Sequence, residues 1–122
     1  MPPSPLEIVT AYCEAWNATA DSERRALLEK SWADGGAYAD PRTDLAGRDA
    51  LFAHIAKVQA ARPGSRIVMT SGLDLHHGAL RFAWKLVNPQ GGTVAEGIDF
   101  GELAADGRLQ RIIGFFGPLP RP

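Results

Sequence analysis

The sequence has a single cysteine, Cys13, and no compact group of cysteine and histidine residues. One cysteine cannot form an intramolecular disulfide, and the Cys and His positions do not have the spacing of zinc ligands. No glycine-rich run leads from a strand into a helix with a lysine after it, which excludes a phosphate-binding loop. We therefore expect a function that needs neither a metal nor an organic cofactor.

An excess of charge of either sign is also missing, because 13 Lys and Arg residues stand against 14 Asp and Glu residues. This balance argues against nucleic acid or an anionic membrane as the main partner. No apolar run reaches transmembrane length, and the N-terminus lacks the pattern of a signal peptide. We expect a soluble, cytoplasmic protein with one domain over residues 1–122.

Three helices are predicted in the first half of the chain. The first begins at Ser4, which can cap the helix, with Pro5 at the first helical position and Glu7 completing a capping box. The second is expected from residue 21 or 22 to residue 32, after a short polar break. The third is expected over residues 47–62, where Pro63 and Gly64 end it.

Strands dominate the second half. A turn at residues 34–36 and a short strand at 37–40, cut off by Pro41, precede the third helix. After that helix, alternation predicts four strands. They cover residues 67–77 with an interruption at Gly72, residues 80–86, and two stretches within 93–117 that a turn at 105–107 joins. Helices followed by antiparallel hairpins indicate an α+β domain with the helices on one face of the sheet.

Asp99 is the most informative polar residue of the strand half. Alternation places it on one strand face with Ala95, Gly97 and Gly101, which have almost no side chains. The glycines could mark a bulge or a close helix contact, with Asp99 bound to the backbone. Alternatively they leave a hollow in which Asp99 is the polar group. The residues alone leave both interpretations open.

Three further residues are candidates with ordinary structural alternatives. Tyr12 borders the buried face of the first helix, where a tyrosine commonly packs in the core. Asp40 stands at a strand end before Pro41, where aspartate commonly forms turns. His54 lies at the margin of the third helix, a position that is usually half exposed.

The strand face opposite Asp99 is apolar, and it carries Ile98, Phe100, Ile113 and Phe115. Three helices can cover only one face of a sheet this small, so the other face would expose a contiguous apolar patch. A two-fold partner presenting the same patch is the simplest cover. We therefore expect a homodimer with Phe100 and Phe115 near the centre of its interface.

Several segments resemble the NTF2-like superfamily, which includes SnoaL-like polyketide cyclases and ketosteroid isomerases. These segments are AYCEAWNA, AYADP, AGRDAL, and GIDF followed by DGR and GFFG, within residues 8–117. The resemblance implies an α+β cone in which three N-terminal helices pack on a curved, mainly antiparallel sheet that encloses a pocket. It also implies dimerisation through the outer sheet face, as in similar proteins of the superfamily.

The resemblance to ketosteroid isomerases also implies a mechanism. Tyr12 matches their oxyanion-hole tyrosine, Asp99 their protonated oxyanion-hole acid, and Asp40 their general base. Asp40 would remove a proton next to a carbonyl, and Tyr12 and Asp99 would stabilise the enolate oxygen. His54 and Gly101 stand where the isomerases carry aromatic pocket residues, so a steroid-shaped slot is not implied.

The pocket wall is expected on the helices and on the inner sheet face. The residues expected to contact a hydrophobic small-molecule substrate are Trp16, His54, Ile55, Phe82, Trp84, Leu86, Ile112 and Phe116. Two other functions would use the same pocket. One is a non-catalytic ligand-binding or interaction domain, and the other is a hydrolase or dehydratase. The sequence does not separate these functions from the isomerase.

Overall fold

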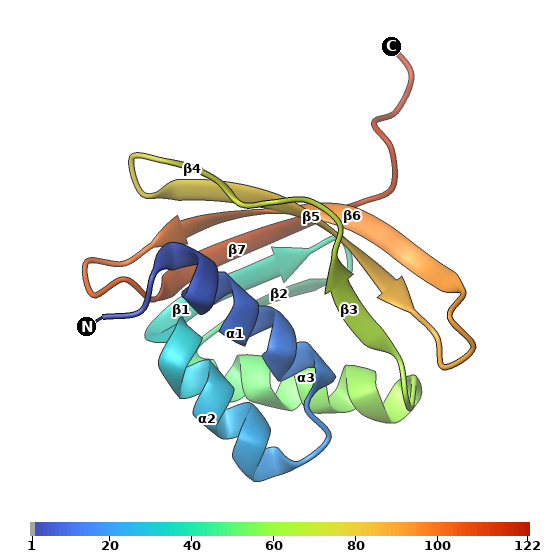
Figure 1. Cartoon of the computed structure of the whole chain (residues 1–122), viewed down its shortest axis with the longest axis horizontal. Coiled ribbons are helices and arrows are strands. Elements are labelled where there is room, and N and C mark those ends of the chain that lie inside the picture. Colours follow the sequence, from blue (N-terminus) through green and yellow to red (C-terminus); the bar gives the residue numbers. More distant parts are fainter. Residues whose placement is uncertain (1) are drawn as a thin grey trace.

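The computed structural model describes residues 2–122, in which three helices pack against a seven-stranded sheet (Figure 1). In chain order the elements are α1 (Pro5–Asn17), α2 (Asp21–Ser31), β1 (Trp32–Asp40), β2 (Thr43–Ala46), α3 (Arg48–Ala61), β3 (Arg66–Met69), β4 (Asp74–His76), β5 (Ala79–Val87), β6 (Thr93–Leu103) and β7 (Leu109–Phe116).

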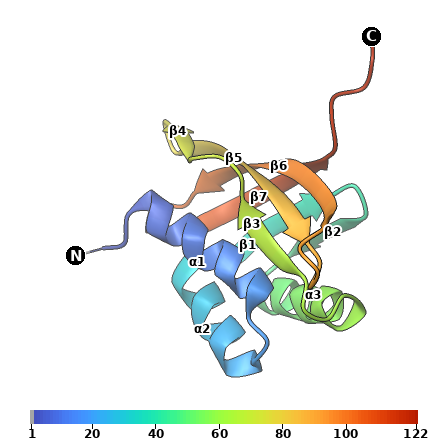
Figure 2. The same ribbon diagram turned by 45° about the vertical axis from the view of Figure 1, so that its right-hand side comes forward.

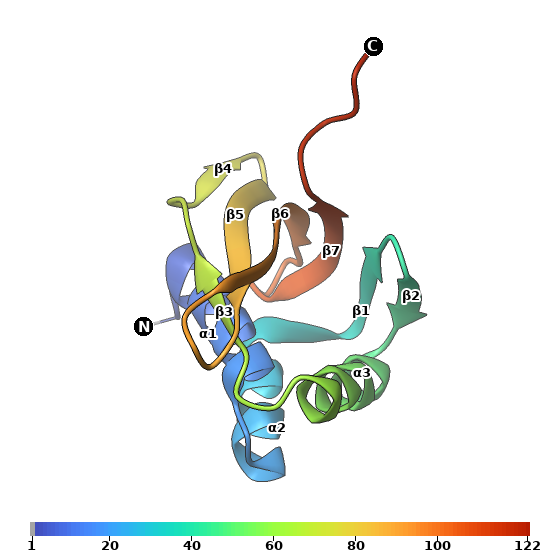
Figure 3. The same cartoon turned by 90° about the vertical axis from the view of Figure 1, so that its right-hand side faces the viewer.

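The strand order is β2-β1-β7-β6-β5-β3, and β4 also pairs with β5. Neighbouring strands run antiparallel except β1 and β7, which run parallel. The sheet is curved and does not close, and the helices lie on its concave side (Figure 3). This arrangement confirms the expected α+β cone with a mainly antiparallel sheet. No helix among residues 2–122 is both long and apolar enough to span a membrane.

The start of α1 is as the sequence predicts. Ser4 Oγ accepts a hydrogen bond from the Glu7 backbone N–H at 3.2 Å, and Glu7 Oε1 accepts one from the Ser4 N–H at 3.3 Å. The two bonds form a capping box, which satisfies two N–H groups that a helix start otherwise leaves unpaired. The capped helix presents Val9, Tyr12 and Cys13 to the core.

The predicted turn at residues 34–36 is wrong, because this segment continues β1. Helix α2 ends at Ser31, so Trp32 starts the strand instead of ending the helix. The glycines form an irregularity, because the pairing with β7 shifts register between Trp32 and Ala37. The Trp32 indole N–H donates to the Gly36 carbonyl at 3.1 Å, and a Cβ on Gly36 would lie only 2.5 Å from the indole nitrogen. Gly36 therefore makes room for a tryptophan side chain that folds back along its own strand.

Two other strand predictions need correction. Strand β2 was not predicted, because its four residues are exposed or half buried and carry no apolar run. The single strand expected over residues 67–77 is two short strands, β3 and β4, which pair with different ends of β5. Five strands therefore follow α3, where the sequence predicts four.

The outer sheet face is exposed as expected. Ile98, Phe100 and Phe115 are 44%, 40% and 57% exposed, and the two phenyl rings meet edge to face with centroids 5.8 Å apart. Beyond β7, residues 117–122 extend away from the sheet (Figure 2), and Leu119 is almost fully exposed.

Candidate functional site

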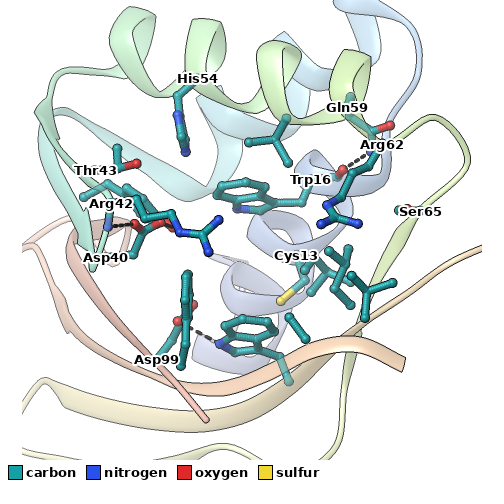
Figure 4. Close-up of a pocket in the computed structure, with 18 of the residues that line it drawn as sticks. Cys13, Trp16, Asp40, Arg42, Thr43, His54, Gln59, Arg62, Ser65 and Asp99 are labelled. Carbon is teal, nitrogen blue, oxygen red and sulfur yellow. Dashed lines mark hydrogen bonds between the residues drawn. The ribbon is translucent and has the colours of Figure 1, made fainter. Parts of the chain in front are cut away.

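A cavity of about 450 Å³ lies between the helices and the concave face of the sheet (Figure 4). This volume falls within the range of small-molecule sites, about 300–1,000 Å³. The residues that line it come from helices α1 and α3, the β1–β2 turn, the segment between α3 and β3, and strands β1, β2, β3, β5, β6 and β7. They include Tyr12, Cys13, Trp16, Tyr38, Asp40, Arg42, Thr43, His54, Val58, Gln59, Arg62, Ser65, Ile67, Phe82, Trp84, Leu86, Asp99 and Phe116.

Asp99 lies on the inner face of β6, where only 8% of it is exposed. Its Oδ1 accepts a hydrogen bond from the Trp84 indole N–H at 2.9 Å (Figure 4). A Cβ on Gly97 would lie 2.7 Å from Trp84 Cζ2, so the indole lies over a strand position that has no side chain. Asp99 therefore faces a cavity and is bound by a side chain, as the second interpretation expects, but the space over Gly97 is filled by the Trp84 indole and is not hollow.

The environment of Asp99 favours its protonated form. Burial raises the pKa of this carboxyl group to about 7, although the hydrogen bond from Trp84 lowers it. The nearby charge of Asp40 raises it further. A carboxylic acid is therefore populated at this position near neutral pH, and an acid can donate a hydrogen bond.

Asp40 lies at the end of β1 and also lines the cavity. Its Oδ2 accepts a hydrogen bond from the Tyr38 hydroxyl at 2.5 Å, and its Oδ1 accepts one from the Arg42 backbone N–H at 2.8 Å. The second bond is the turn-forming role expected for aspartate before proline. Asp40 thus fills the structural role and faces the cavity as well.

Gly114 on β7 separates the two carboxyl groups. It pairs with Asp99 of β6, and the register of β1 with β7 places Ala39 beside Ile113, which brings Asp40 next to Gly114. A Cβ on Gly114 would lie 2.9 Å from Asp99 Oδ1 and 3.6 Å from Asp40 Cβ. The absence of a side chain on this strand therefore lets the two carboxyl groups share one region of the cavity.

Tyr12 enters the cavity wall from α1, on the helical side. Its ring stacks on Trp32 with centroids 5.5 Å apart and meets Trp16 edge to face. Burial raises the pKa of the Tyr12 hydroxyl well above its usual value, and the negative charge of Asp99 adds to the shift. The hydroxyl therefore stays protonated and keeps a proton to donate.

The rings of Trp16, Tyr38 and His54 contact one another in the cavity wall. His54 of α3 lies 5.8 Å from Trp16 and 5.7 Å from Tyr38, measured between ring centroids. Burial lowers the pKa of His54, the charge of Asp40 opposes this shift, and that of Lys57 adds to it. At neutral pH the imidazole is therefore mainly uncharged.

Most of the residues predicted from the sequence meet in this cavity, but two do not. Ile55 and Ile112 are fully buried in the core and are not part of the lining. A Cβ on Gly101 would lie 2.8 Å from Ile112 Cδ1 and 3.0 Å from Leu80 Cδ1, so these side chains fill the space over Gly101. The residues that do line the cavity are Tyr12, Trp16, Asp40, His54, Phe82, Trp84, Leu86, Asp99 and Phe116.

Sequence reasoning missed several residues of the lining. Tyr38 could have been found, because it stands two residues before Asp40 and so shares its strand face. Burial of Tyr38 and its hydrogen bond to Asp40 raise the pKa of its hydroxyl strongly. Cys13 also lines the cavity, and burial raises the pKa of its thiol to about 12, which keeps it protonated and unreactive. Arg42 and Arg62 lie in turn and helix-end positions that carried no sequence signal.

Solved structures with the same fold span nearly the whole chain, whereas no family model and no curated protein matches it. A candidate isomerase of the SnoaL-like family from Agrobacterium tumefaciens is 33% identical, with a TM-score of 0.86 over 91% of this chain and 95% of the other. An NTF2-like protein of unknown function from Exiguobacterium is 16% identical, with a TM-score of 0.74 over 92% and 99% of the two chains.

A third protein, from Catenulispora acidiphila, has a ketosteroid isomerase-like fold and was solved with trimethylamine. It is 14% identical, with a TM-score of 0.71 over 91% of this chain and 85% of the other. At this identity the likeness concerns the fold alone. The Agrobacterium protein shares both fold and sequence over almost its full length. The chain described here therefore belongs to the SnoaL-like family, within the NTF2-like superfamily.

Proposed function

We propose that this protein catalyses proton transfer next to a carbonyl group of a small molecule, in the manner of an isomerase or cyclase. The observation that carries the proposal is the contrast between two carboxyl groups in one cavity. Asp99 is buried and has its pKa raised to about 7, whereas Asp40 receives hydrogen bonds from Tyr38 and the Arg42 backbone. Two carboxyl groups whose environments differ in this way suit the roles of acid and base.

In the proposed mechanism the substrate carbonyl oxygen lies between the Tyr12 hydroxyl and the Asp99 carboxylic acid. Asp40 removes a proton from the carbon next to the carbonyl, and the electron pair of that C–H bond moves onto the oxygen. Tyr12 and Asp99 donate hydrogen bonds to the resulting enolate. Asp40 then returns the proton to another carbon. General base catalysis contributes about 10²–10⁴-fold, and preorganised oxyanion donors commonly contribute more.

The two groups bound to Asp40 support its assignment as the base. Hydrogen bonds from the Tyr38 hydroxyl and the Arg42 N–H fix the carboxylate in one orientation. Residues of α1 and α3 cover the cavity on the side opposite the sheet. A bound substrate would therefore be largely withdrawn from water, which strengthens the hydrogen bonds to a developing enolate.

The substitution Asp40→Asn tests this function. It should abolish turnover of cyclic β,γ-unsaturated ketones while leaving their binding largely intact, because only the base is lost. Asp44→Asn is a matched control, since Asp44 is exposed on β2 and is not part of the cavity. A wild-type protein that binds these ketones without converting any of them would contradict the proposal and favour a non-catalytic ligand-binding domain.

We also propose that two copies of the chain associate through the outer sheet face. The exposed side chains of Ile98, Phe100 and Phe115 support this arrangement, because monomers rarely expose contiguous apolar patches. The patch lies on the sheet face opposite the cavity, and its three residues are not among those that line the cavity.

A further inference from the structure

Two arginine side chains reach into a cavity whose lining is otherwise mainly apolar. Arg42 lies in the turn between β1 and β2, and Arg62, the residue directly after α3, lies at the other side of the cavity. Figure 4 shows both guanidinium groups extending toward the centre of the cavity. Both residues are exposed, so they form part of the cavity rim and not of its floor.

Neither guanidinium has an acidic partner within residues 2–122. Among residues 2–122, the ion pairs of arginine with aspartate involve Arg24, Arg25, Arg48, Arg81 and Arg108, and neither Arg42 nor Arg62 takes part. The two side chains also donate no hydrogen bond within this part of the chain, since Arg42 contributes only its backbone N–H. Ten guanidinium N–H donors are thus available for an occupant of the cavity, at five for each arginine.

The rest of the cavity divides into regions of different chemistry. The carboxyl groups of Asp40 and Asp99 share the region around Gly114, and Phe82, Trp84 and Leu86 on β5 supply apolar wall. A negatively charged group placed between Asp40 and Asp99 would be repelled, whereas one placed between the two guanidinium groups would meet two positive charges. A substrate with one anionic end would therefore bind in a single direction.

We propose that the substrate is a small keto acid, which has a carbonyl at one end of an apolar skeleton and a carboxylate at the other. This inference deepens the proposed function, on which the position of the carbonyl rests. Arg42 and Arg62 bind the carboxylate, since planar guanidinium groups match carboxylate geometry. The apolar skeleton contacts Phe82, Trp84 and Leu86, and the carbonyl reaches Tyr12 and Asp99.

Binding of three related compounds tests the proposal without any need for turnover. Hydroxynaphthoate carries a phenol that mimics an enol and a carboxylate at the far end. Its methyl ester has the same skeleton without the charge, and naphthol lacks the carboxyl group altogether. Isothermal titration calorimetry at about pH 6, where Asp99 is mainly protonated, gives the three dissociation constants.

We expect the wild-type protein to bind hydroxynaphthoate about tenfold more tightly than the ester, because the two ion pairs lie at a partly solvated rim. The advantage should shrink as salt is added. In Arg42→Gln combined with Arg62→Gln the acid and the ester should bind about equally, and the affinity for naphthol should stay at the wild-type value. Arg66→Gln is the matched control, because Arg66 is exposed on β3 and is not part of the lining.

Equal affinities of wild-type protein for the acid and the ester would overturn the proposal. So would an equal loss of affinity for all three compounds in the double variant, since that result indicates a change in the cavity itself. Circular dichroism checks that the variant folds, which is expected because both arginines are exposed. The outcome is separate from the Asp40→Asn test. A charge-dependent affinity without any turnover would support the anion site and contradict the catalytic proposal.

Discussion

The Trp84 indole N–H binds one oxygen of the Asp99 carboxyl group, at 2.9 Å, and leaves the other oxygen without a partner among residues 2–122. Because Oδ1 accepts the indole hydrogen, the proton of the carboxylic acid is favoured on Oδ2. A proton on Oδ1 would point at the indole hydrogen. The same hydrogen bond lowers the pKa of Asp99, although the larger effect of burial raises it. The bond also fixes which oxygen carries the proton when Asp99 is protonated. Asp99 can then donate only through Oδ2.

The first prediction concerns stability against pH. The folded pKa of Asp99 is about 7, above the usual value of 3.8, so the folded state binds its proton more tightly than the unfolded state does. The contribution to stability is complete below about pH 4 and is lost as pH rises through about 7. The free energy of unfolding should fall by up to about 4 kcal/mol across this window.

Urea unfolding of the wild type and of Asp99→Asn across this pH range measures the effect. The variant should show a flatter pH profile, because its amide does not titrate. Asp44→Asn, which changes an exposed residue, should keep the wild-type profile. If wild type and Asp99→Asn have parallel profiles, Asp99 ionises like a surface carboxylate and does not suit the oxyanion role.

The second prediction concerns Gly114→Ala. The new methyl group would lie 2.9 Å from Asp99 Oδ1. The Asp99 carboxyl group must therefore leave its position beside Trp84 and Asp40. We expect a loss of about 1–3 kcal/mol in unfolding free energy, together with weaker binding of the enol mimic naphthol. Gly35→Ala is the control, because a Cβ there meets nothing within 4 Å. Wild-type stability and affinity in Gly114→Ala would show that the two carboxyl groups tolerate a side chain between them.

The third prediction concerns assembly. Sedimentation should show a homodimer of the wild type at micromolar concentration, and Phe115→Asp should give monomer or aggregate, because it places a charge in a desolvated interface. Phe115 and Phe100 contact each other on the outer face, so one charge disturbs both rings. Leu75→Asp changes an exposed apolar residue on β4 outside this patch and should remain dimeric. A stable wild-type monomer at that concentration would rule out the interface.

Local patterns were enough to predict much of the fold. The capping box of α1 and the alternation that buries Asp99 while exposing Ile98 and Phe100 both follow from neighbouring residues. Contacts between distant segments were not predictable. The glycines at 35 and 36 look like a turn, and only the folded chain shows that the Trp32 indole packs over Gly36. Ile112 has the alternation of a cavity residue, but it fills the space over Gly101 on the adjacent strand.

The parallel pairing of β1 with β7 has a consequence for how the protein becomes functional as it is made. Asp40 lies in the first third of the chain, but the strand beside it, Leu109–Phe116, is among the last segments that a ribosome produces. Contacts of such long sequence separation form late and slowly, because a large loop must close before they contribute. The proposed base therefore reaches its place beside Gly114 only after nearly the entire chain has been synthesised, and a nascent chain that lacks this strand would have no complete site.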